Sequence, residues 1–227
     1  MSTAIEVRNL EKVYNQGELC VKALDGISLS IEQGSFVAIT GESGSGKSTL
    51  INIIGCMDVQ SAGDIIIEGE KIEQNDGRLS KIRGEKLGMI FQGYHLLPML
   101  TAEENILMPC SFAGKEIRAE EVSELIDNLS LNGREKHLPS ELSGGQQQRV
   151  AIGRALINKP RILLADEPTG NLDKKTGEEI IELLLELKDK YNMTLVIVTH
   201  SEKIAMLADR EIRLEDGRII KDEQRNN

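Results

Sequence analysis

Aromatic residues are scarce in this chain, whose 227 residues include three phenylalanines, three tyrosines and no tryptophan. A buried core must therefore rest on Ile, Leu and Val side chains. Long apolar runs are missing as well. Because a bilayer-crossing helix needs about twenty such residues in succession, we expect no membrane-spanning segment. Positions 1–10 lack a basic stretch followed by an apolar one, so we also expect no secretory signal.

Cysteine is also rare. Cys20, Cys56 and Cys110 are odd in number, far apart in the sequence and not at the spacing of metal ligands. This pattern argues against a disulfide framework and against a zinc site. Because thiols stay reduced in the cytosol, we interpret the three cysteines as structural thiols of a cytosolic protein.

Positive charge is in short supply. The chain has 27 Lys and Arg residues against 37 Asp and Glu residues, which gives a net charge of −10. Non-specific nucleic-acid binding needs a basic face that displaces counterions, so this balance argues against a nucleic-acid partner. It also argues against direct adhesion to anionic lipid, but not against docking onto a membrane protein.

The first part of the chain contains a clear succession of strand and helix patterns. Residues 23–31 alternate apolar and polar side chains, as a half-buried antiparallel strand does. A turn at 32–34 leads into a continuous apolar run at 36–40, which is typical of a buried parallel strand. Residues 47–57 then show the pattern of a helix.

Further elements continue along the chain. We expect strands at 64–68, 87–91, 161–165 and 193–199, a helix at 176–190, and two short closing strands near Arg213 and Arg218. The stretch from 102 to about 142 indicates a helical insertion. Thr101 and Glu104 have the spacing of a capping box at its start, and Pro109 is expected to end its first helix. The tail at 222–227 is expected to fray.

A glycine-rich loop lies between the apolar run at 36–40 and the helix at 47–57. It fits the phosphate-binding pattern G-x-x-x-x-G-K-[ST] with Gly41, Glu42, Ser43, Gly44, Ser45, Gly46, Lys47 and Ser48. Its glycines let successive backbone N–H groups point at a triphosphate, and the positive end of the following helix adds to the attraction. We expect Lys47 to reach the β- and γ-phosphates, Ser48 to bind Mg²⁺ and Thr49 to reach the α-phosphate. The alternative is a flexible serine-glycine turn, which the strand before and the helix after disfavour.

Two carboxylates end a later apolar strand. Residues 162–165 are apolar, and Asp166 and Glu167 follow directly. In an open α/β sheet the carboxyl ends of the strands face the ligand. We therefore expect Asp166 to hold Mg²⁺, directly or through water, and Glu167 to act as general base toward the attacking water. Taken alone, an apolar run followed by Asp-Glu is also the end of many ordinary strands.

A second glycine-rich segment lies about a hundred residues after the first. It comprises Leu142, Ser143, Gly144, Gly145 and Gln146, and it opens a helical stretch. Ser143 and the glycine N–H groups at a helix start form a second anion site. A simple helix N-cap at Ser143 is the alternative, and the two interpretations are compatible.

These three motifs resemble the ATP-binding cassette (ABC) ATPases, and the resemblance covers essentially the whole chain. In the family's pattern Tyr14 corresponds to an aromatic residue that stacks on adenine. Gln92 matches the glutamine that senses Mg²⁺ and couples to a membrane partner. Asn171-Leu172-Asp173 matches the D-loop, and His200 matches a histidine that contacts the γ-phosphate. The simpler alternatives are a surface aromatic, a loop polar group, a helix N-cap at Asp173 and a strand-end histidine.

The resemblance implies an α/β fold of the P-loop ABC ATPase type. This fold has a mainly parallel core sheet, an N-terminal antiparallel β subdomain and a helical insertion. Residues 1–227 would form one domain, with a RecA-like core at about 1–100 and 160–227 and a helical signature subdomain at about 101–159.

The resemblance also implies ligands and partners. In this family the signature of one subunit closes over the nucleotide held by another, so ATP, Mg²⁺ and a second copy of the chain are expected. An integral membrane permease is expected as a further partner. Four stretches are similar to the lipoprotein-release and macrolide-exporter group, namely 21–26, 52–56, 96–98 and 165–173. That group implies an exporter, an extracytoplasmic adaptor reached through the permease, and a cytoplasmic position on the inner face of the cell membrane.

Three other classes of ABC protein are alternatives. ATPases of DNA repair and chromosome structure carry a long coiled coil or a zinc module between the two glycine-rich motifs, and this chain has neither. Translation-associated members normally carry two cassettes, and this chain has one. A regulator of a non-transporting membrane complex, such as a cell-division assembly, would use the same motifs and stays open. The departures from the pattern are Gly153, where alanine is commoner, and Gly93-Tyr94-His95 after Gln92.

Overall fold

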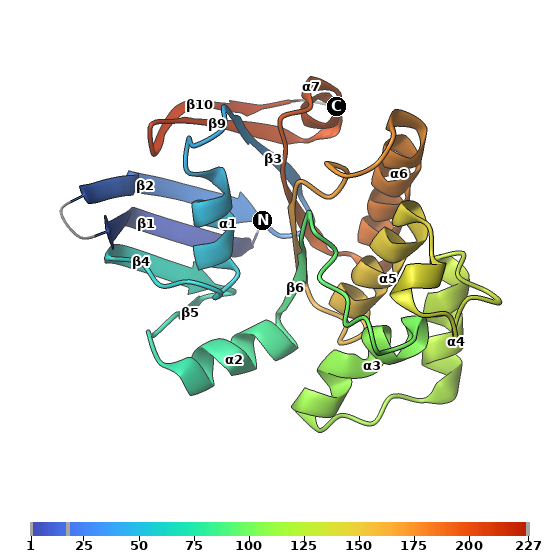
Figure 1. The fold of residues 1–227 in the computed structure, drawn as a ribbon. Helices are drawn as coiled ribbons and strands as arrows, with labels where there is room; N and C mark the ends of the chain where they lie inside the picture. The colour runs from blue at the N-terminus through green and yellow to red at the C-terminus, as the bar shows by residue number, and fades with distance from the viewer. Residues whose placement is uncertain (1, 17–18, 226–227) are drawn as a thin grey trace.

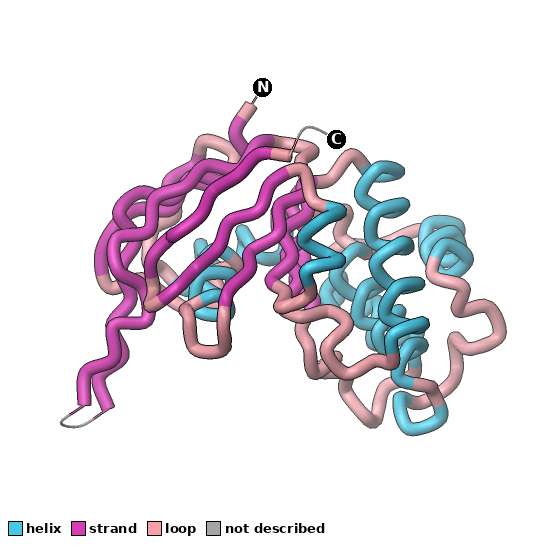
Figure 2. The backbone as a smooth tube through the Cα atoms, turned by 90° about the horizontal axis from the view of Figure 1, so that it is seen from above, coloured by secondary structure: helices cyan, strands magenta, loops and turns pink. Residues whose placement is uncertain are grey.

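The computed structural model of the protein describes residues 2–16 and 19–225, and it is built around two β-sheets with helices between and beside them (Figure 1). Viewed from above, most strands gather in one half of the molecule and most helices in the other (Figure 2). Among the described residues, no helix combines the length and the apolar character that a bilayer crossing requires.

The smaller sheet is antiparallel and has the strand order β2-β1-β4-β5. Its strands are β1 (Thr3–Gln16), β2 (Leu19–Glu32), β4 (Ala62–Ile67) and β5 (Glu70–Lys71). The expected strand at 23–31 lies within β2 and is antiparallel, as predicted. Strand β1 was not predicted from the sequence. Asn9 has a φ of 46°, and the pairing register shifts between Val7 and Leu10, so the alternation of apolar residues is interrupted there.

The larger sheet has the order β10-β9-β3-β8-β7-β6 and is parallel except for its closing hairpin. Its strands are β3 (Phe36–Gly41), β6 (Leu87–Ile90), β7 (Ile162–Asp166), β8 (Thr194–Val198), β9 (Arg210–Glu215) and β10 (Arg218–Gln224). The mainly parallel core sheet and the antiparallel N-terminal sheet are therefore confirmed.

The parallel strands are buried on both faces. In β3, Phe36 and Ala38 belong to one hydrophobic cluster, while Val37 and Ile39 belong to another. Successive side chains of a strand point to opposite faces, so the sheet separates two cores. One core contains the smaller sheet and the helix after β3, and the other contains the helices of the second half. This two-sided burial explains the continuous apolar runs in the sequence.

The helices occupy two regions. Helix α1 (Lys47–Ile54) lies between the two sheets, and α2 (Asp76–Glu85) lies below the smaller one (Figure 1). The second region holds α3 (Ala102–Ala113), α4 (Ala119–Asn128), the 3₁₀ turn η1 (Pro139–Glu141) and α5 (Gly144–Leu156). Helix α6 (Lys174–Tyr191) packs beside α5, and the short α7 (Glu202–Leu207) follows β8.

Three expectations about local structure were wrong. Pro109 does not end its helix but lies inside α3, whose residues Ile106 and Cys110 are buried. The capping box at the start of α3 is present as expected. Helix α1 ends at Ile54 instead of 57, because Cys56 adopts a φ of 56°. The tail is part of β10 as far as Gln224, while residues 226–227 lie outside the described residues. Helix α2 was not predicted, because only Leu79 and Ile82 are buried in it and its sequence shows no apolar periodicity.

Candidate functional site

The glycine-rich loop after β3 takes a conformation that only glycine supports at two of its positions. A side chain on Gly41 would place its Cβ 2.2 Å from the carbonyl oxygen of Leu214, and one on Gly46 would come 2.5 Å from that of Ala23. Gly46 is also the left-handed N-cap of α1, with a φ of 101°. The strand, loop and helix that the motif requires are therefore all present.

Lys47 lies inside this loop and is only 6% exposed. Its ammonium group donates to the backbone oxygens of Gly41 at 2.9 Å and of Glu42 at 2.6 Å. These carbonyls solvate the buried charge, as burial of an ammonium requires. The cation is thus held within a loop whose N–H groups already favour an anion.

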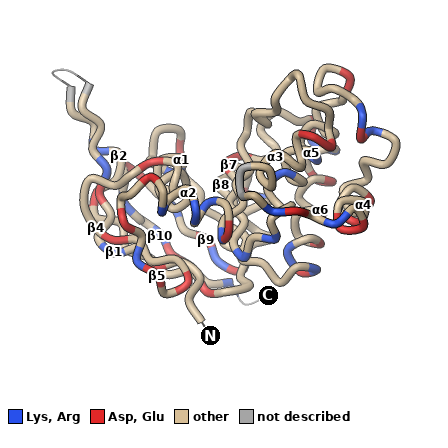
Figure 3. The backbone as a smooth tube through the Cα atoms, turned by 90° about the horizontal axis from the view of Figure 1, so that it is seen from below, with Lys and Arg blue, Asp and Glu red and all other residues tan. Residues whose placement is uncertain are grey.

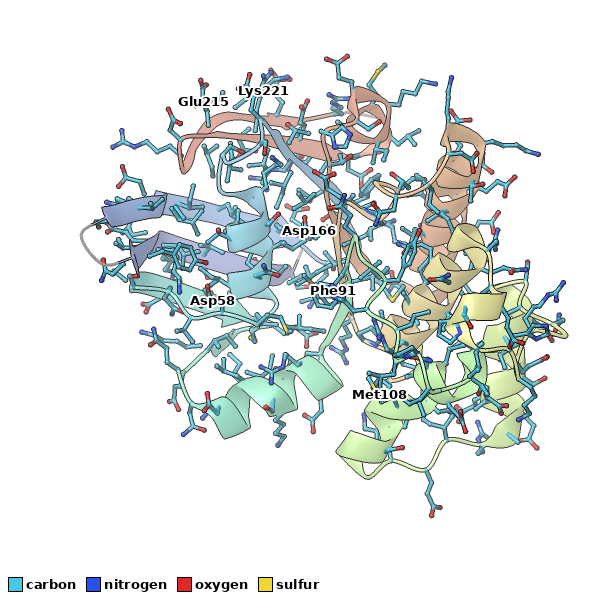
Figure 4. All side chains as sticks on the ribbon, in the orientation of Figure 1. Asp58, Phe91, Met108, Asp166, Glu215 and Lys221 are labelled. Carbon is cyan, nitrogen blue, oxygen red and sulfur yellow. The ribbon has the colours of Figure 1, made fainter. Side chains whose placement is uncertain are left out.

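Two oxygen donors meet between the loop and β7. The hydroxyl of Ser48, in the first turn of α1, donates to Asp166 Oδ1 at 3.2 Å. Asp166 ends β7 and lies beside α1 near the middle of the molecule (Figure 4). Burial raises the pKa of the Asp166 carboxyl, and the neighbouring Glu167 charge raises it further. A hydroxyl and a carboxylate that converge next to a phosphate-binding loop fit Mg²⁺, which uses one or two carboxylates together with phosphate oxygens.

Glu167 and His200 form a second pair beside that site. Glu167 follows β7 and His200 follows β8, and these two strands are neighbours. His200 Nδ1 lies 2.9 Å from Glu167 Oε2, with the imidazole 71% exposed and the carboxylate 23% exposed. Glu167 has a φ of 46°, a strained value for a non-glycine residue. The extended conformation of β7 therefore ends at Asp166, and the Glu167 carboxylate lies against the histidine.

The second glycine-rich segment, 142–146, is the signature segment of the resemblance, and it opens α5. Ser143 Oγ accepts from the N–H of Gln146 at 3.3 Å, and Gln146 Oε1 accepts from the N–H of Ser143 at 2.9 Å. In the single chain, Ser143 is therefore the N-cap of α5, as the simpler alternative predicted. Close neighbours also explain the glycines: a Cβ on Gly144 would lie 3.2 Å from the Tyr94 hydroxyl, and one on Gly145 would lie 2.6 Å from Thr176.

Gln92 begins the loop that joins β6 to the helical region, and this loop is held by contacts that sequence reasoning missed. Asn171 Nδ2 donates to the Gln92 backbone oxygen at 2.8 Å. Arg154 in α5 donates to the backbone oxygens of Tyr94 at 2.6 Å and His95 at 2.5 Å. The Gln92 side chain packs against Gly170, and the structure records no hydrogen bond between it and Ser48 or Asp166 within the described residues.

Asp173 is the N-cap of α6. Its Oδ1 accepts from the N–H groups of Lys175 and Thr176, both at 3.1 Å. The Thr176 hydroxyl and N–H bonds lower the pKa of the Asp173 carboxyl. The simpler interpretation of this residue is thus correct in the single chain, and its place at the exposed start of α6 leaves it free to face another molecule.

Tyr14 lies on β1, and its hydroxyl donates to Asp58 Oδ2 at 2.6 Å. Asp58 comes shortly after α1, whose other end carries the phosphate-binding loop. Figure 4 shows Asp58 at the lower end of α1, beside the smaller sheet. No sequence motif pointed to Asp58.

The predicted site residues fall into two separate groups. The first group lies at the ends of β3, β7 and β8 and comprises the loop at 41–49, Asp166, Glu167 and His200, with Tyr14 on β1 of the smaller sheet. The second group starts a helix in the other half of the molecule (Figure 1) and comprises Ser143, Gly144, Gly145 and Gln146. Basic and acidic residues are interspersed along the backbone instead of forming one basic stripe (Figure 3).

Comparison with known proteins adds a family match. The family described as "ABC transporter" matches residues 24–170. A macrolide export ATP-binding/permease protein MacB from Mannheimia succiniciproducens is 49% identical over 98% of this chain, which spans only 35% of that relative. The lipoprotein-releasing system ATP-binding protein LolD from Geobacter metallireducens is 46% identical, with 98% of this chain and 100% of the relative covered.

A solved structure is similar over nearly its full length. The cassette MJ0796, in a dimeric post-hydrolysis state bound to ADP and Pi, has a TM-score of 0.91 and 42% sequence identity, covering 98% of this chain and 99% of that one. The protein MJ0796 of Methanocaldococcus jannaschii is described as an uncharacterized ABC transporter ATP-binding protein.

Proposed function

This chain belongs to the ABC transporter family, and we propose that it works as the ATP-hydrolysing subunit of a membrane transport complex, in a head-to-tail pair of identical chains. The chain is an ABC-type ATPase cassette that binds adenine nucleotide. The observation that carries the pairing is the separation of the phosphate-binding loop from the segment 142–146. Residues 1–227 act as one domain, with a core at about 1–100 and 160–227 and a helical part at about 101–159.

Binding of ATP uses the loop at 41–49 first. Its N–H groups and the positive end of α1 take the phosphates, and Lys47 exchanges its backbone carbonyls for the β- and γ-phosphate oxygens. Thr49 reaches the α-phosphate. Tyr14 receives the adenine ring on its face, since aromatic rings stack on bases with a gain of about 1–3 kcal/mol.

A Mg²⁺ ion fits the oxygen donors of Ser48 and Asp166, with Gln92 as the third residue that reaches it. When bound, the ion neutralises the negative charge that builds up on the phosphates. The Ser48–Asp166 contact of 3.2 Å supports this assignment for those two residues. Gln92 has to leave its contact with Gly170 to take part.

Hydrolysis is assigned to Glu167 and His200. The Glu167 carboxylate accepts a proton from water, whose oxygen then bonds to the γ-phosphorus while the bond to the bridging oxygen of ADP breaks. His200 holds that carboxylate in place through the 2.9 Å contact and offers its exposed side to the γ-phosphate. The products are ADP and inorganic phosphate.

The second chain supplies what the first one lacks. Ser143, Gly144, Gly145 and Gln146 of one copy cover the γ-phosphate held by the other, and Asp173 borders the same interface. Because the γ-phosphate touches both copies, ATP favours the closed pair more than ADP does, and this difference in affinity drives the motion. Similarity to a dimeric cassette supports this arrangement.

The membrane partner is proposed to be an export permease with an extracytoplasmic adaptor, on the inner face of the cell membrane. Support comes from the relatives named for lipoprotein release and macrolide export. Two exposed apolar side chains also support it, because Leu97 and Met99, in the loop that Gln92 begins, are 39% and 72% exposed. The acidic charge balance fits a protein partner and not a nucleic acid.

The experiment is capture of the tagged chain from detergent-solubilised native cells, followed by mass spectrometry. We expect a near-stoichiometric integral membrane protein, and we expect M99D to lose it. Ile220 on β10 is 53% exposed and provides the matched control, I220D, which should retain the partner. Recovery without any membrane protein, or with DNA or ribosomes, would overturn the transport proposal and leave the ATPase intact. A membrane partner that moves no substrate would instead favour the regulator of a non-transporting complex.

A further inference from the structure

A lysine and an aspartate lie directly behind the tyrosine proposed to receive the base. Lys12 and Tyr14 are two residues apart on β1, and the ammonium of Lys12 lies over the ring of Tyr14. Asp58 contacts both of them: its Oδ1 accepts from Lys12 Nζ at 2.7 Å, and its Oδ2 accepts from the Tyr14 hydroxyl at 2.6 Å. Lys12 Nζ also donates to the backbone oxygen of Val59 at 2.6 Å.

These polar groups are shielded from water more than an ordinary surface ion pair. The Lys12 side chain is 10% exposed and that of Asp58 is 29% exposed. Burial opposes the charged form of Asp58, but the hydrogen bonds from Lys12 and Tyr14 outweigh it and lower the pKa of the carboxyl. Burial, together with the bond to Asp58, raises the pKa of the Tyr14 phenol. The phenol therefore remains a donor to a carboxylate, which is a strong kind of hydrogen bond.

The ring of Tyr14 is also held from one side. The Lys12 ammonium lies 4.7 Å from the ring centroid, a cation–π distance. An ammonium on one face leaves the opposite face for a flat, electron-poor partner. The hydroxyl of the ring is thus held by Asp58 and one face by Lys12.

Asp58 connects this ring to the phosphate-binding loop. Helix α1 begins at Lys47 and ends at Ile54, and Asp58 follows within one short turn. The chain turns back after the helix, and the N–H of Asp58 donates to the backbone oxygen of Asn52 within α1 at 3.3 Å, so Asp58 is fixed to the helix that the phosphate loop begins. A tether from Tyr14 to Asp58 therefore fixes the base site relative to the phosphate site.

We propose that Lys12 and Asp58 are positioning residues for the nucleobase: they lock Tyr14 in its stacking orientation at a set distance from the phosphate loop. The inference rests on the proposed role of Tyr14 in receiving adenine. The lock contributes to the affinity for the adenosine part of ATP, and it acts on ATP binding more than on the chemical step. Neither residue needs to touch the nucleotide.

The test compares two ligands, ATP and inorganic tripolyphosphate, each of which displaces a fluorescent ATP analogue from the full chain. Tripolyphosphate occupies the phosphate loop but has no base. The variants are Y14A, Y14F, D58N and the double variant Y14F/D58N. Asp64 forms an exposed ion pair with Lys71 at 2.8 Å, so D64N is the matched control for loss of a surface carboxylate.

We expect Y14F and D58N each to weaken ATP binding about 3- to 10-fold, the range of one lost hydrogen bond. Tripolyphosphate should bind all variants alike. D58N leaves one acceptor oxygen for the two donors Lys12 and Tyr14, so it weakens the bond that Y14F removes. The double variant should therefore lose less than the product of the single losses. For D58N the KM for ATP should rise more than kcat falls, and D64N should match the parent chain.

Three outcomes would overturn the inference, and they differ in what else they affect. If Y14A binds ATP normally, the stacking role of Tyr14 is wrong and the lock has nothing to position. If Y14A is weakened while Y14F and D58N are not, stacking survives and the lock is wrong. If D58N loses tripolyphosphate as much as ATP, Asp58 supports the phosphate loop and not the base. Y14F, which leaves the Lys12–Asp58 pair in place, keeps the test valid should D58N fold poorly.

Discussion

At the scale of single residues, the proposed chemistry depends on side chains at the tips of buried strands. Asp166 and Glu167 end β7, and His200 follows β8. These strands are apolar because both faces of the sheet are covered, so polar groups come only where the strand ends. The ends of these strands could be predicted from the sequence, because an apolar run marks where a buried strand stops. It could not predict the contact of Glu167 with His200, which joins residues far apart in the chain.

The first prediction concerns Glu167. Replacing it by Gln removes the proposed proton acceptor and preserves the size of the side chain, so we expect kcat to fall at least about 100-fold while ATP still binds. Steady-state phosphate release measures it. Glu178, in an exposed pair with Lys203, gives the control variant E178Q, which should turn over normally. Near-normal turnover of E167Q would remove Glu167 from the mechanism.

The second prediction concerns the thiols. Burial raises the pKa of Cys56 from 9.0 to about 11, and Cys110 is also buried, whereas Cys20 is exposed. At pH 8 we therefore expect a disulfide reagent to label Cys20 rapidly and the other two only after unfolding in urea. The variant C20S should show no fast labelling. Equally fast labelling of Cys56 in the folded chain would contradict its burial.

The same shift sets a pH dependence of stability. Because the folded pKa of Cys56 lies above the unfolded value, the unfolded chain releases this proton first as the pH rises. The contribution of the buried thiol to stability is fully present below about pH 9 and is lost as the pH rises through about 11. Urea unfolding of C56A should show a weaker decline over this interval than the parent chain.

At the scale of elements, the phosphate-binding loop is supported by the hairpin that closes the chain. The turn between β9 and β10 contains Gly217, whose N–H donates to the Ser45 backbone oxygen at 3.1 Å. The Gly217 oxygen accepts from the N–H of Asp25 at 2.9 Å. The turn thus links the loop to β2. A Cβ on Gly217 would lie 2.8 Å from the Ala23 oxygen, so this position needs glycine.

The third prediction tests that support with two glycines of almost equal backbone conformation. Gly217 has a φ of 74° and Gly133 a φ of 75°, but a Cβ on Gly133 would meet nothing within 4 Å. Both G217A and G133A should lose about 1–2 kcal/mol of unfolding free energy through the left-handed conformation. Only G217A should also bind ATP more weakly, because its clash displaces the Ser45 carbonyl. Equal ATP affinities would show that the hairpin does not support the loop.

Elements that depend on tertiary contacts were the hardest to predict. Pro109 lies within α3 because the buried residues Ile106 and Cys110 pack the turns on both sides of it. Strand β1 was missed because the bulge near Asn9 shifts its alternation. Likewise, Asp58 carries no motif, and its role became visible only when the fold brought it to Tyr14. Strands with uninterrupted apolar runs, such as β3 and β8, could be predicted from their composition alone.

At the scale of the whole molecule, the central feature is the division of the proposed site between two halves. The phosphate loop lies with the two sheets, and the segment 142–146 lies with the helices (Figure 1). Arg154 in α5 binds the backbone of the loop after Gln92, so the signature helix and that loop are connected and should move together. A second chain is the simplest source of the missing half.

The fourth prediction follows from that division. Ser143 is exposed at the start of α5, so S143R places a long cation where the partner's nucleotide has to fit. The single chain should still bind ATP, because its own phosphate loop is distant from this change. Closure of the pair and hydrolysis should be lost. Loss of ATP binding by the isolated S143R chain would contradict a site shared between two copies.

The most direct measurement is the molar mass of E167Q in solution by light scattering, with ATP and Mg²⁺ and then with ADP and Mg²⁺. The account predicts a dimer with ATP and a monomer with ADP, because only ATP supplies the γ-phosphate that touches both chains. E167Q/S143R should stay monomeric with either nucleotide. The shared site would be contradicted if the parent protein hydrolyses ATP while its E167Q variant remains a monomer at saturating ATP.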